Sequence, residues 1–103
     1  MTRGIYGYFT EEGNCIYIGQ SEDIERRSFA HKNYSWYKDN LYPTILLEVP
    51  PEYNLLDIEA WFIFAFNPIS NNVRARPKKY GKEYNYLDSL GFDFNSPSSS
   101  AFP

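Results

Sequence analysis

Two strand-like runs near the N-terminus, separated by a turn, constrain the fold more than any other feature of this chain. Residues 3–10 (RGIYGYFT) and 15–19 (CIYIG) are rich in β-branched and aromatic residues, which favour strands. The four residues between them include Gly13 and have the composition of a reverse turn. The pattern therefore predicts a hairpin of two antiparallel strands.

Side-chain alternation along these strands predicts what each face of the hairpin carries. A turn centred near Glu12 and Gly13 places Tyr6, Tyr8 and Tyr17 together on one face. The opposite face is then apolar, with Ile5, Phe9, Ile16 and Ile18. Tyrosines from both strands are expected to share one surface.

A helix and a loop are expected after the hairpin. Ser21 is a suitable N-cap for a helix over roughly 22–32, and the acidic Glu22 and Asp23 in its first turn suit the helix dipole. Residues 33–42 are polar and aromatic and predict a loop. Arg27 and His31 stand four residues apart, on one face of this helix.

The following segments predict another strand and two more helices. Residues 43–49 (PTILLEV) form the third expected strand, ended by two prolines. Asn54 with Asp57 resembles a capping pair for a helix through about Phe66. A short helix over 84–90 is expected to end at a glycine. The predicted class is α+β, with one antiparallel sheet and flanking helices.

The length of 103 residues predicts a single domain. We assign it to residues 1–95, and the composition of residues 96–103 (SPSSSAFP) predicts a disordered tail. Neither a signal peptide nor a long apolar segment is visible, which predicts a cytoplasmic protein. Cys15 and His31 are the only residues of their types, so a metal bound within one chain must be held by oxygen.

The formal charge of −3 argues mildly against nucleic-acid binding, but the charge is unevenly distributed. Residues 1–66 carry five Lys and Arg against ten Asp and Glu, whereas residues 67–103 carry five against three. The basic residues of the second part are concentrated around Tyr80 and are Arg74, Arg76, Lys78, Lys79 and Lys82. This stretch is either a solvated charge run or a nucleic-acid-binding segment that tracks phosphates and stacks a base.

Glu59 is the most informative carboxylate because it lies within a predicted helix that is apolar almost all round. If it is buried, it requires a cation, a metal or a shifted pKa. If the start of the helix is exposed, it simply reaches solvent. The sequence leaves both interpretations open.

Taken singly, the other polar residues have ordinary explanations. Arg27 and His31 suit a solvated helix face, with Arg26 next to Arg27, and Tyr6 and Tyr17 suit sheet packing with exposed hydroxyls. Their joint spacing is more specific. Gly4-Ile5-Tyr6 and then Tyr17-Ile18-Gly19 are followed by Arg27, His31, Glu59, Pro68 and Asn71. Over about residues 3–72 this series resembles the GIY-YIG nuclease superfamily.

The resemblance implies a three-stranded antiparallel sheet with helices around it and an active site on the tyrosine face. It implies one metal, Mg²⁺ or Mn²⁺, on Glu59, and a scissile phosphate bound by Arg27. Tyr6 would deprotonate or orient the attacking water, and Tyr17 would support the phosphate. His31 matches a position that assists in some members, and Asn71 matches an asparagine that braces the site.

These residue types suit phosphodiester hydrolysis. The reaction builds negative charge on phosphate oxygens, which a guanidinium and a metal stabilise. Arg27 offers a planar fork of donors, and Glu59 is an oxygen ligand of the kind Mg²⁺ prefers. A tyrosine base needs a lowered pKa, and we expect the metal and Arg27 to favour the phenolate of Tyr6.

The function expected from the resemblance is a divalent-metal-dependent endonuclease acting on DNA. The alternatives are a catalytically silent module of the same fold that binds nucleic acid, and a protein-interaction or inhibitor domain that uses its acidic face. The oligomeric state is not determined by the sequence, and a dimer is compatible with it.

Overall fold

A computed structural model describes residues 1–30, 43–71 and 76–92. Its elements are β1 (Gly4–Phe9), β2 (Cys15–Ser21), α1 (Ile24–Ala30), β3 (Thr44–Glu48), α2 (Leu55–Phe66) and α3 (Lys82–Ser89). The predicted 33–42 loop and the predicted 96–103 tail lie outside the described residues. In the part of the chain that is described, no helix has the length and apolar character needed to cross a membrane.

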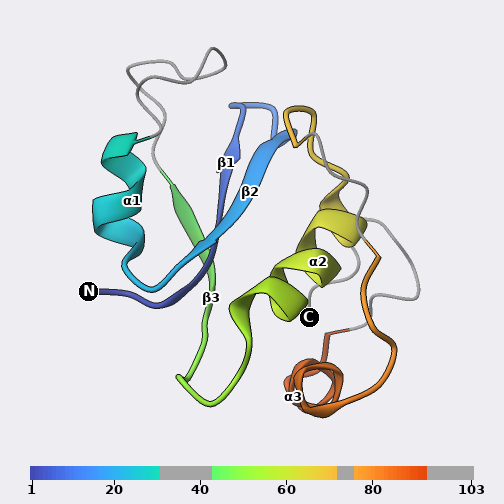
Figure 1. Ribbon diagram of the computed structural model, residues 1–103. Helices are drawn as coiled ribbons and strands as arrows, with labels where there is room; N and C mark the ends of the chain where they lie inside the picture. Colours follow the sequence, from blue (N-terminus) through green and yellow to red (C-terminus); the bar gives the residue numbers. More distant parts are fainter. Residues whose placement is uncertain (31–42, 72–75, 93–103) are drawn as a thin grey trace.

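The strands form one antiparallel sheet in the order β2-β1-β3, with β1 at its centre. Helix α1 contacts β1 and β2, whereas α2 contacts β2, β1 and α3. Figure 1 shows the resulting layers: α1 on one side of the sheet, α2 on the other, and α3 beyond α2. The predicted α+β class with a three-stranded antiparallel sheet is confirmed.

The hairpin between β1 and β2 forms where the sequence predicts it. The amide of Gly13 donates to the carbonyl of Thr10 (2.9 Å), and that of Thr10 donates to the carbonyl of Asn14 (2.9 Å). Gly13 has φ 89°, a left-handed conformation that glycine adopts without strain. The predicted turn therefore forms through hydrogen bonds within residues 10–14.

One residue of the hairpin lies on the face opposite to that expected. Tyr8 pairs with Tyr17 and Phe9 pairs with Cys15, so Ile16 is an extra residue in a β-bulge. Ile16 therefore packs with the tyrosines, and Cys15 occupies the apolar face in its place. The prediction for Ile16 was wrong because strict alternation does not anticipate a bulge.

Gly4 begins the tripeptide Gly4-Ile5-Tyr6 and Gly19 ends Tyr17-Ile18-Gly19. At each glycine another part of the protein comes closer than a side chain would allow. A Cβ on Gly4 would collide with the backbone carbonyl oxygen of Leu47 on β3. A Cβ on Gly19 would lie 2.5 Å from both Cζ and the hydroxyl oxygen of Tyr6, its cross-strand partner. Gly4 thus lets β3 pair closely with β1, and Gly19 leaves room for the ring of Tyr6 beside β2.

Helix α2 begins and ends as predicted. The side chain of Asn54 accepts a hydrogen bond from the amide of Asp57 (3.1 Å), and Asn67 closes the helix in a left-handed conformation with φ 48°. Helix α3 starts two residues before the expected range, and Gly91 (φ 91°) follows it. Local signals therefore predicted both ends of α2 and the C-terminal end of α3, but not the start of α3.

Helix α1 begins later than expected and has a different cap. The carboxylate of Asp23 accepts from the amide of Arg26 (3.2 Å), while Ser21 accepts from the amide of Asp23 (2.9 Å). Ser21 is the last residue of β2, so the helix starts at Ile24. Serine and aspartate both favour the N-cap position. Asp23 caps α1 because Ser21 still belongs to β2.

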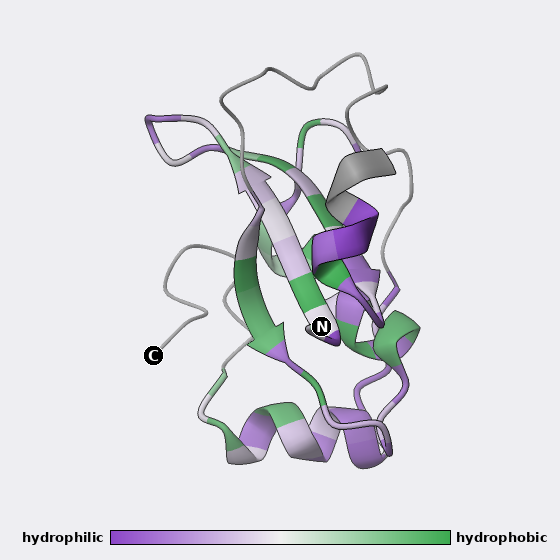
Figure 2. Ribbon diagram, turned by 90° about the vertical axis from the view of Figure 1, so that its left-hand side faces the viewer, coloured by the Kyte–Doolittle hydropathy of each residue, from purple (hydrophilic) through white to green (hydrophobic). Residues whose placement is uncertain are grey.

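The larger core lies between the sheet and α2. It includes Ile5 and Ile18 from the sheet and Ile58, Trp61 and Phe62 from α2. Although α2 is apolar almost all round, it is not buried on every side, because Leu56 and Phe64 are 61% and 39% exposed. Figure 2 shows the contrast between the hydrophobic strand β3 and the mainly hydrophilic α1.

Candidate active site

Tyr6 is at the centre of a small second cluster on the α1 face of the sheet. Its side chain is 1% exposed and packs with Tyr8 and Ile24, with Tyr17 and Ile16 at the edge. The ring centroids of Tyr6 and Tyr8 are 6.1 Å apart at 87°, and those of Tyr6 and Tyr17 are 6.4 Å apart at 41°. The structure therefore brings the two motif tyrosines together, as predicted.

Helix α1 adds Arg27 to this cluster. Arg27 is exposed, and its guanidinium hydrogen-bonds to the hydroxyl oxygen of Tyr6. The helix is held in place by Thr2, whose carbonyl accepts from the amide of Ile24 (2.8 Å) and whose hydroxyl donates to Glu25 (2.6 Å). A buried phenol and an exposed cation thus meet at the surface.

The electrostatics of Tyr6 differ from the expectation for a tyrosine base. Burial, and then the neighbouring Tyr17, raise the pKa of Tyr6 above its ordinary value, and Arg27 opposes this only in part. The expected lowering by Arg27 is present but is outweighed. Tyr6 is therefore a neutral phenol at neutral pH, suited to accept a hydrogen bond from Arg27 and to keep its own proton.

Asn71 braces β2 from the outside of the sheet. Its side-chain oxygen accepts from the amide of Ile18 (2.9 Å), and its side-chain nitrogen donates to the carbonyl of the same residue (2.9 Å). The neighbouring Ser70 donates its amide to the carbonyl of Ile16 (2.8 Å). Ile18 follows Tyr17, so Asn71 holds the backbone next to a motif tyrosine. That it braces an active site stays a prediction.

Glu59 lies on α2, on the other side of the sheet from Arg27 (Figure 1). Its side chain is half-buried, and burial raises the pKa of its carboxyl to about 7. Among the described residues, none forms a hydrogen bond or an ion pair with it. The structure thus supports the interpretation of Glu59 as a partly buried carboxylate. It links Glu59 to the tyrosines only through the strands β2 and β1, against which α2 packs.

The carboxylate of Glu59 suits a divalent metal only in part. Among the described residues, no group of three or more His, Cys, Asp or Glu could hold a metal ion. A lone half-buried carboxylate matches the sparse protein ligation of Mg²⁺, which takes water and phosphate oxygens as its other ligands. Glu59 would be the residue that holds it.

Beside Arg27 is an open pocket of about 330 Å³, lined by Ser21, Glu22, Asp23, Arg26 and Arg27. The acidic members are already engaged, since Asp23 caps α1 and Glu22 pairs with Arg3 (3.6 Å). Arg27 thus lines a pocket that is open to solvent. His31 lies outside the described residues, so its role stays a prediction.

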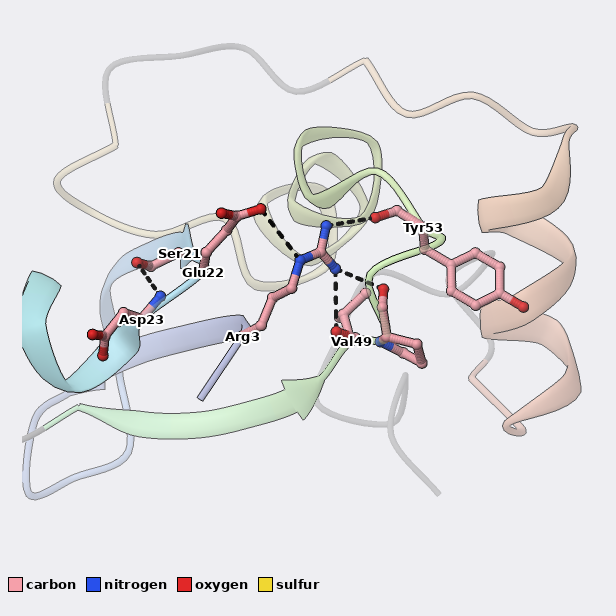
Figure 3. A network of polar contacts seen from close by, with 7 residues as sticks. Arg3, Ser21, Glu22, Asp23, Val49 and Tyr53 are labelled. Atoms are coloured by element: carbon pink, nitrogen blue, oxygen red, sulfur yellow. Dashed lines mark hydrogen bonds and ion pairs between the residues drawn. The ribbon is translucent and has the colours of Figure 1, made fainter. Parts of the chain in front are cut away.

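Arg3 organises the structure around the site, and sequence reasoning missed it. Its guanidinium donates to the carbonyls of Val49 (3.1 Å), Pro50 (2.6 Å) and Tyr53 (2.9 Å), as Figure 3 shows together with its ion pair to Glu22. Arg3 thus ties the entry to α1 to the loop before α2. The only sequence signal was a lone arginine at the start of an apolar run, and its acceptors are backbone atoms about fifty residues away.

The predicted nucleic-acid-binding segment lies on another part of the surface. In Figure 1 residues 76–81 run along the side of α2 that faces away from the sheet. The indole nitrogen of Trp61 donates to the carbonyl of Lys78 (3.1 Å) and fixes the segment there. The structure therefore does not bring these residues next to Arg27, and Arg74 lies outside the described residues.

The geometry gives one group of interacting residues, Tyr6, Tyr17 and Arg27, with Asn71 behind their strand and Glu59 on the other face. Comparisons of the chain with protein families, curated proteins and solved structures give no match.

Proposed function

We propose that this chain is a divalent-metal-dependent endonuclease that hydrolyses DNA phosphodiester bonds. The observation that supports the proposal best is the hydrogen bond between exposed Arg27 and buried Tyr6, beside Tyr17. With Tyr17 packed beside Tyr6, three residues of the GIY-YIG pattern meet at one surface, although they come from three different elements. Simple sheet packing of Tyr6 does not require a guanidinium on its hydroxyl.

In this proposal Arg27 binds the scissile phosphate. Its planar fork can donate to two phosphate oxygens while one N–H remains on Tyr6. Tyr6 stays neutral, orients the guanidinium and helps to orient the attacking water, instead of removing its proton as a phenolate. Tyr17, half-buried at the edge of the cluster, supports the phosphate from β2.

Glu59 would hold the metal, Mg²⁺ or Mn²⁺, which when bound supplies Lewis-acid stabilisation of the developing charge. Its raised pKa means that metal and protons compete for the carboxylate near neutral pH. Asn71 has a positioning role, because it holds the backbone of β2 rather than contacting substrate.

The position of Glu59 favours one alternative, a catalytically silent module of the same fold that binds nucleic acid. Arg27 and Glu59 belong to helices on opposite faces of the sheet. If the carboxylate cannot reach the phosphate that Arg27 holds, then binding would remain without cleavage. Turnover and binding must therefore be measured separately.

The proposal is tested by incubating the protein with supercoiled, linear, single-stranded and branched DNA, with Mg²⁺ and with chelator. We expect cleavage that requires the metal, is abolished in Glu59→Gln and persists in the control Glu48→Gln, which changes an exposed carboxylate on β3. Arg27→Lys should be strongly impaired and Arg26→Lys nearly normal, because a point charge cannot replace the fork.

Each result has a distinct meaning. Full Mg²⁺-dependent cleavage by folded Glu59→Gln would remove the metal assignment. DNA binding without cleavage of any substrate by the unaltered protein would establish the silent module instead.

A further inference from the structure

The basic segment contains two kinds of lysine. Lys78 lies 3.8 Å from the carboxylate of Asp57, and Lys82 donates to the carbonyl of Glu52 (2.6 Å). Both ammonium groups are thus engaged with the start of α2 and the loop before it. Their first role is to attach the segment to the domain.

The residues between these anchors remain turned to solvent. Arg76 and Lys79 are exposed, and neither forms an ion pair within the described part of the chain. Tyr80 is 74% exposed, whereas the described tyrosines of the hairpin are buried or half-buried. An accessible ring with a cation on the adjacent residue is therefore displayed on an anchored stretch of backbone.

The anchoring is firm because it involves the core. Trp61 is 2% exposed and donates its indole N–H to the carbonyl of Lys78, two residues before Tyr80. The same indole ring packs against Tyr84 of α3, with centroids 5.4 Å apart. Tyr80 is thus held between two attachment points, which lowers the entropy that a stacked ligand must overcome.

This surface is remote from Arg27. The sheet and α2 lie between α1 and the basic segment, and each layer is roughly 10 Å thick. A nucleic acid bound at Arg27 must therefore extend around the domain to reach Tyr80, or a second strand must bind there.

We propose that Arg76, Lys79 and Tyr80 form a second contact, specific for single-stranded nucleic acid. The inference rests on the proposed function only in that it extends the substrate to a flanking single strand. The guanidinium and the ammonium bind backbone phosphates, and the phenol ring of Tyr80 stacks on an unpaired base. In a duplex the base faces are covered by their neighbours, so a lone exposed ring selects single strands.

The contact is tested by fluorescence anisotropy with a labelled 12-nucleotide dT strand and a labelled 12-base-pair duplex, both in chelator. We expect tighter binding of the single strand. Tyr80→Ala should weaken single-strand binding roughly tenfold, the effect of losing one stacked base, whereas Tyr80→Phe keeps the ring and should bind nearly normally. Lys79→Gln should lower the salt dependence by about one released counterion.

Two outcomes would overturn the proposal: equal affinity for strand and duplex, or single-strand affinity and salt dependence unchanged by Tyr80→Ala and Lys79→Gln. Lys79→Gln leaves the ring in place, so it still decides the matter if Tyr80→Ala fails to fold. Because chelator prevents metal-dependent cleavage, the binding result is independent of whether the chain is a nuclease. A chain that never cleaves but binds in this way would refute the proposed activity alone.

Discussion

The two faces of the sheet are built for different purposes. The α2 face holds a broad apolar core in which Trp61 and Phe62 are almost completely buried. The α1 face holds a small cluster of Tyr6, Tyr8 and Ile24, with an exposed arginine bonded to one of its hydroxyls. The α2 face therefore supplies most of the stability of the fold. The α1 face contributes less apolar burial and instead fixes polar groups in place.

A side chain of the α2 face should give the largest effect on stability. Phe62→Ala removes a fully buried ring and should cost about 3–5 kcal/mol in the free energy of unfolding. The control is Leu56→Ala on the exposed side of the same helix, which should change it by no more than about 0.5 kcal/mol. Urea denaturation measures both, and similar losses would mean that the exposed side is covered in solution.

Tyr6→Phe should instead affect the α1 face, chiefly through activity. Loss of the hydroxyl releases Arg27, so we expect cleavage to fall roughly a hundredfold to a thousandfold, the effect of losing one preorganised contact that stabilises the transition state. The stability cost should be about 1–2 kcal/mol, because the lost hydroxyl is buried and bonded to a charged but exposed partner. Tyr8→Phe, equally buried, should cleave almost normally. Equal losses of cleavage in the two variants would make Tyr6 a packing residue only.

Gly19→Ala tests whether the α1 face tolerates crowding. The added methyl would lie 2.5 Å from the Tyr6 ring, and overpacking of this kind costs about 1–3 kcal/mol. Displacement of Tyr6 should also lower cleavage. At Gly13, where a Cβ meets nothing within 4 Å, substitution by asparagine should have a smaller effect in thermal melts. An unchanged melting temperature for Gly19→Ala would show that the ring moves freely.

The smallest effect concerns Glu59 and pH. Burial raises its pKa from 4.5 to about 7, so between these values the folded chain binds more protons than the unfolded chain. Its contribution to stability is therefore lost as the pH rises through this window. In chelator, the free energy of unfolding of Glu59→Gln should be higher than that of the unaltered protein by about 1–2 kcal/mol at pH 8, after allowance for solvent screening. Near pH 4 the two free energies should be equal. A constant difference across this range would mean that the carboxyl is not desolvated.

Local signals predicted much of the fold. The hairpin turn at Gly13, the Asn54 cap and the stop after Phe66 each depend on residues within one or two turns of chain, and all are present. The bulge at Ile16 and the choice of Asp23 over Ser21 as the cap of α1 depend on how β2 pairs and where it ends. That information is tertiary, so spacing along the chain does not contain it.

The sequence predicted which residues of the candidate site lie together better than it predicted their protonation. Spacing nominated Tyr6, Tyr17 and Arg27, and the structure brings these three together. The sign of the Tyr6 pKa shift was not predictable, because it depends on how deeply the ring is buried. The separation of Glu59 from Arg27 follows from layer order, and the acceptors of Arg3 are carbonyls that no side-chain motif marks.

The strip of chain from Ile69 to Asn71 has a consequence for solubility. The amides of Ile69 and Ser70 bond to the carbonyls of Cys15 and Ile16, and Asn71 occupies both polar groups of Ile18. β2 is at the edge of the sheet, where an unpaired backbone would invite strands from other molecules. Because its polar groups are already bonded there, this edge resists the strand addition that leads to aggregation. Replacing Asn71 would therefore expose a template for association as well as loosen the tyrosine strand.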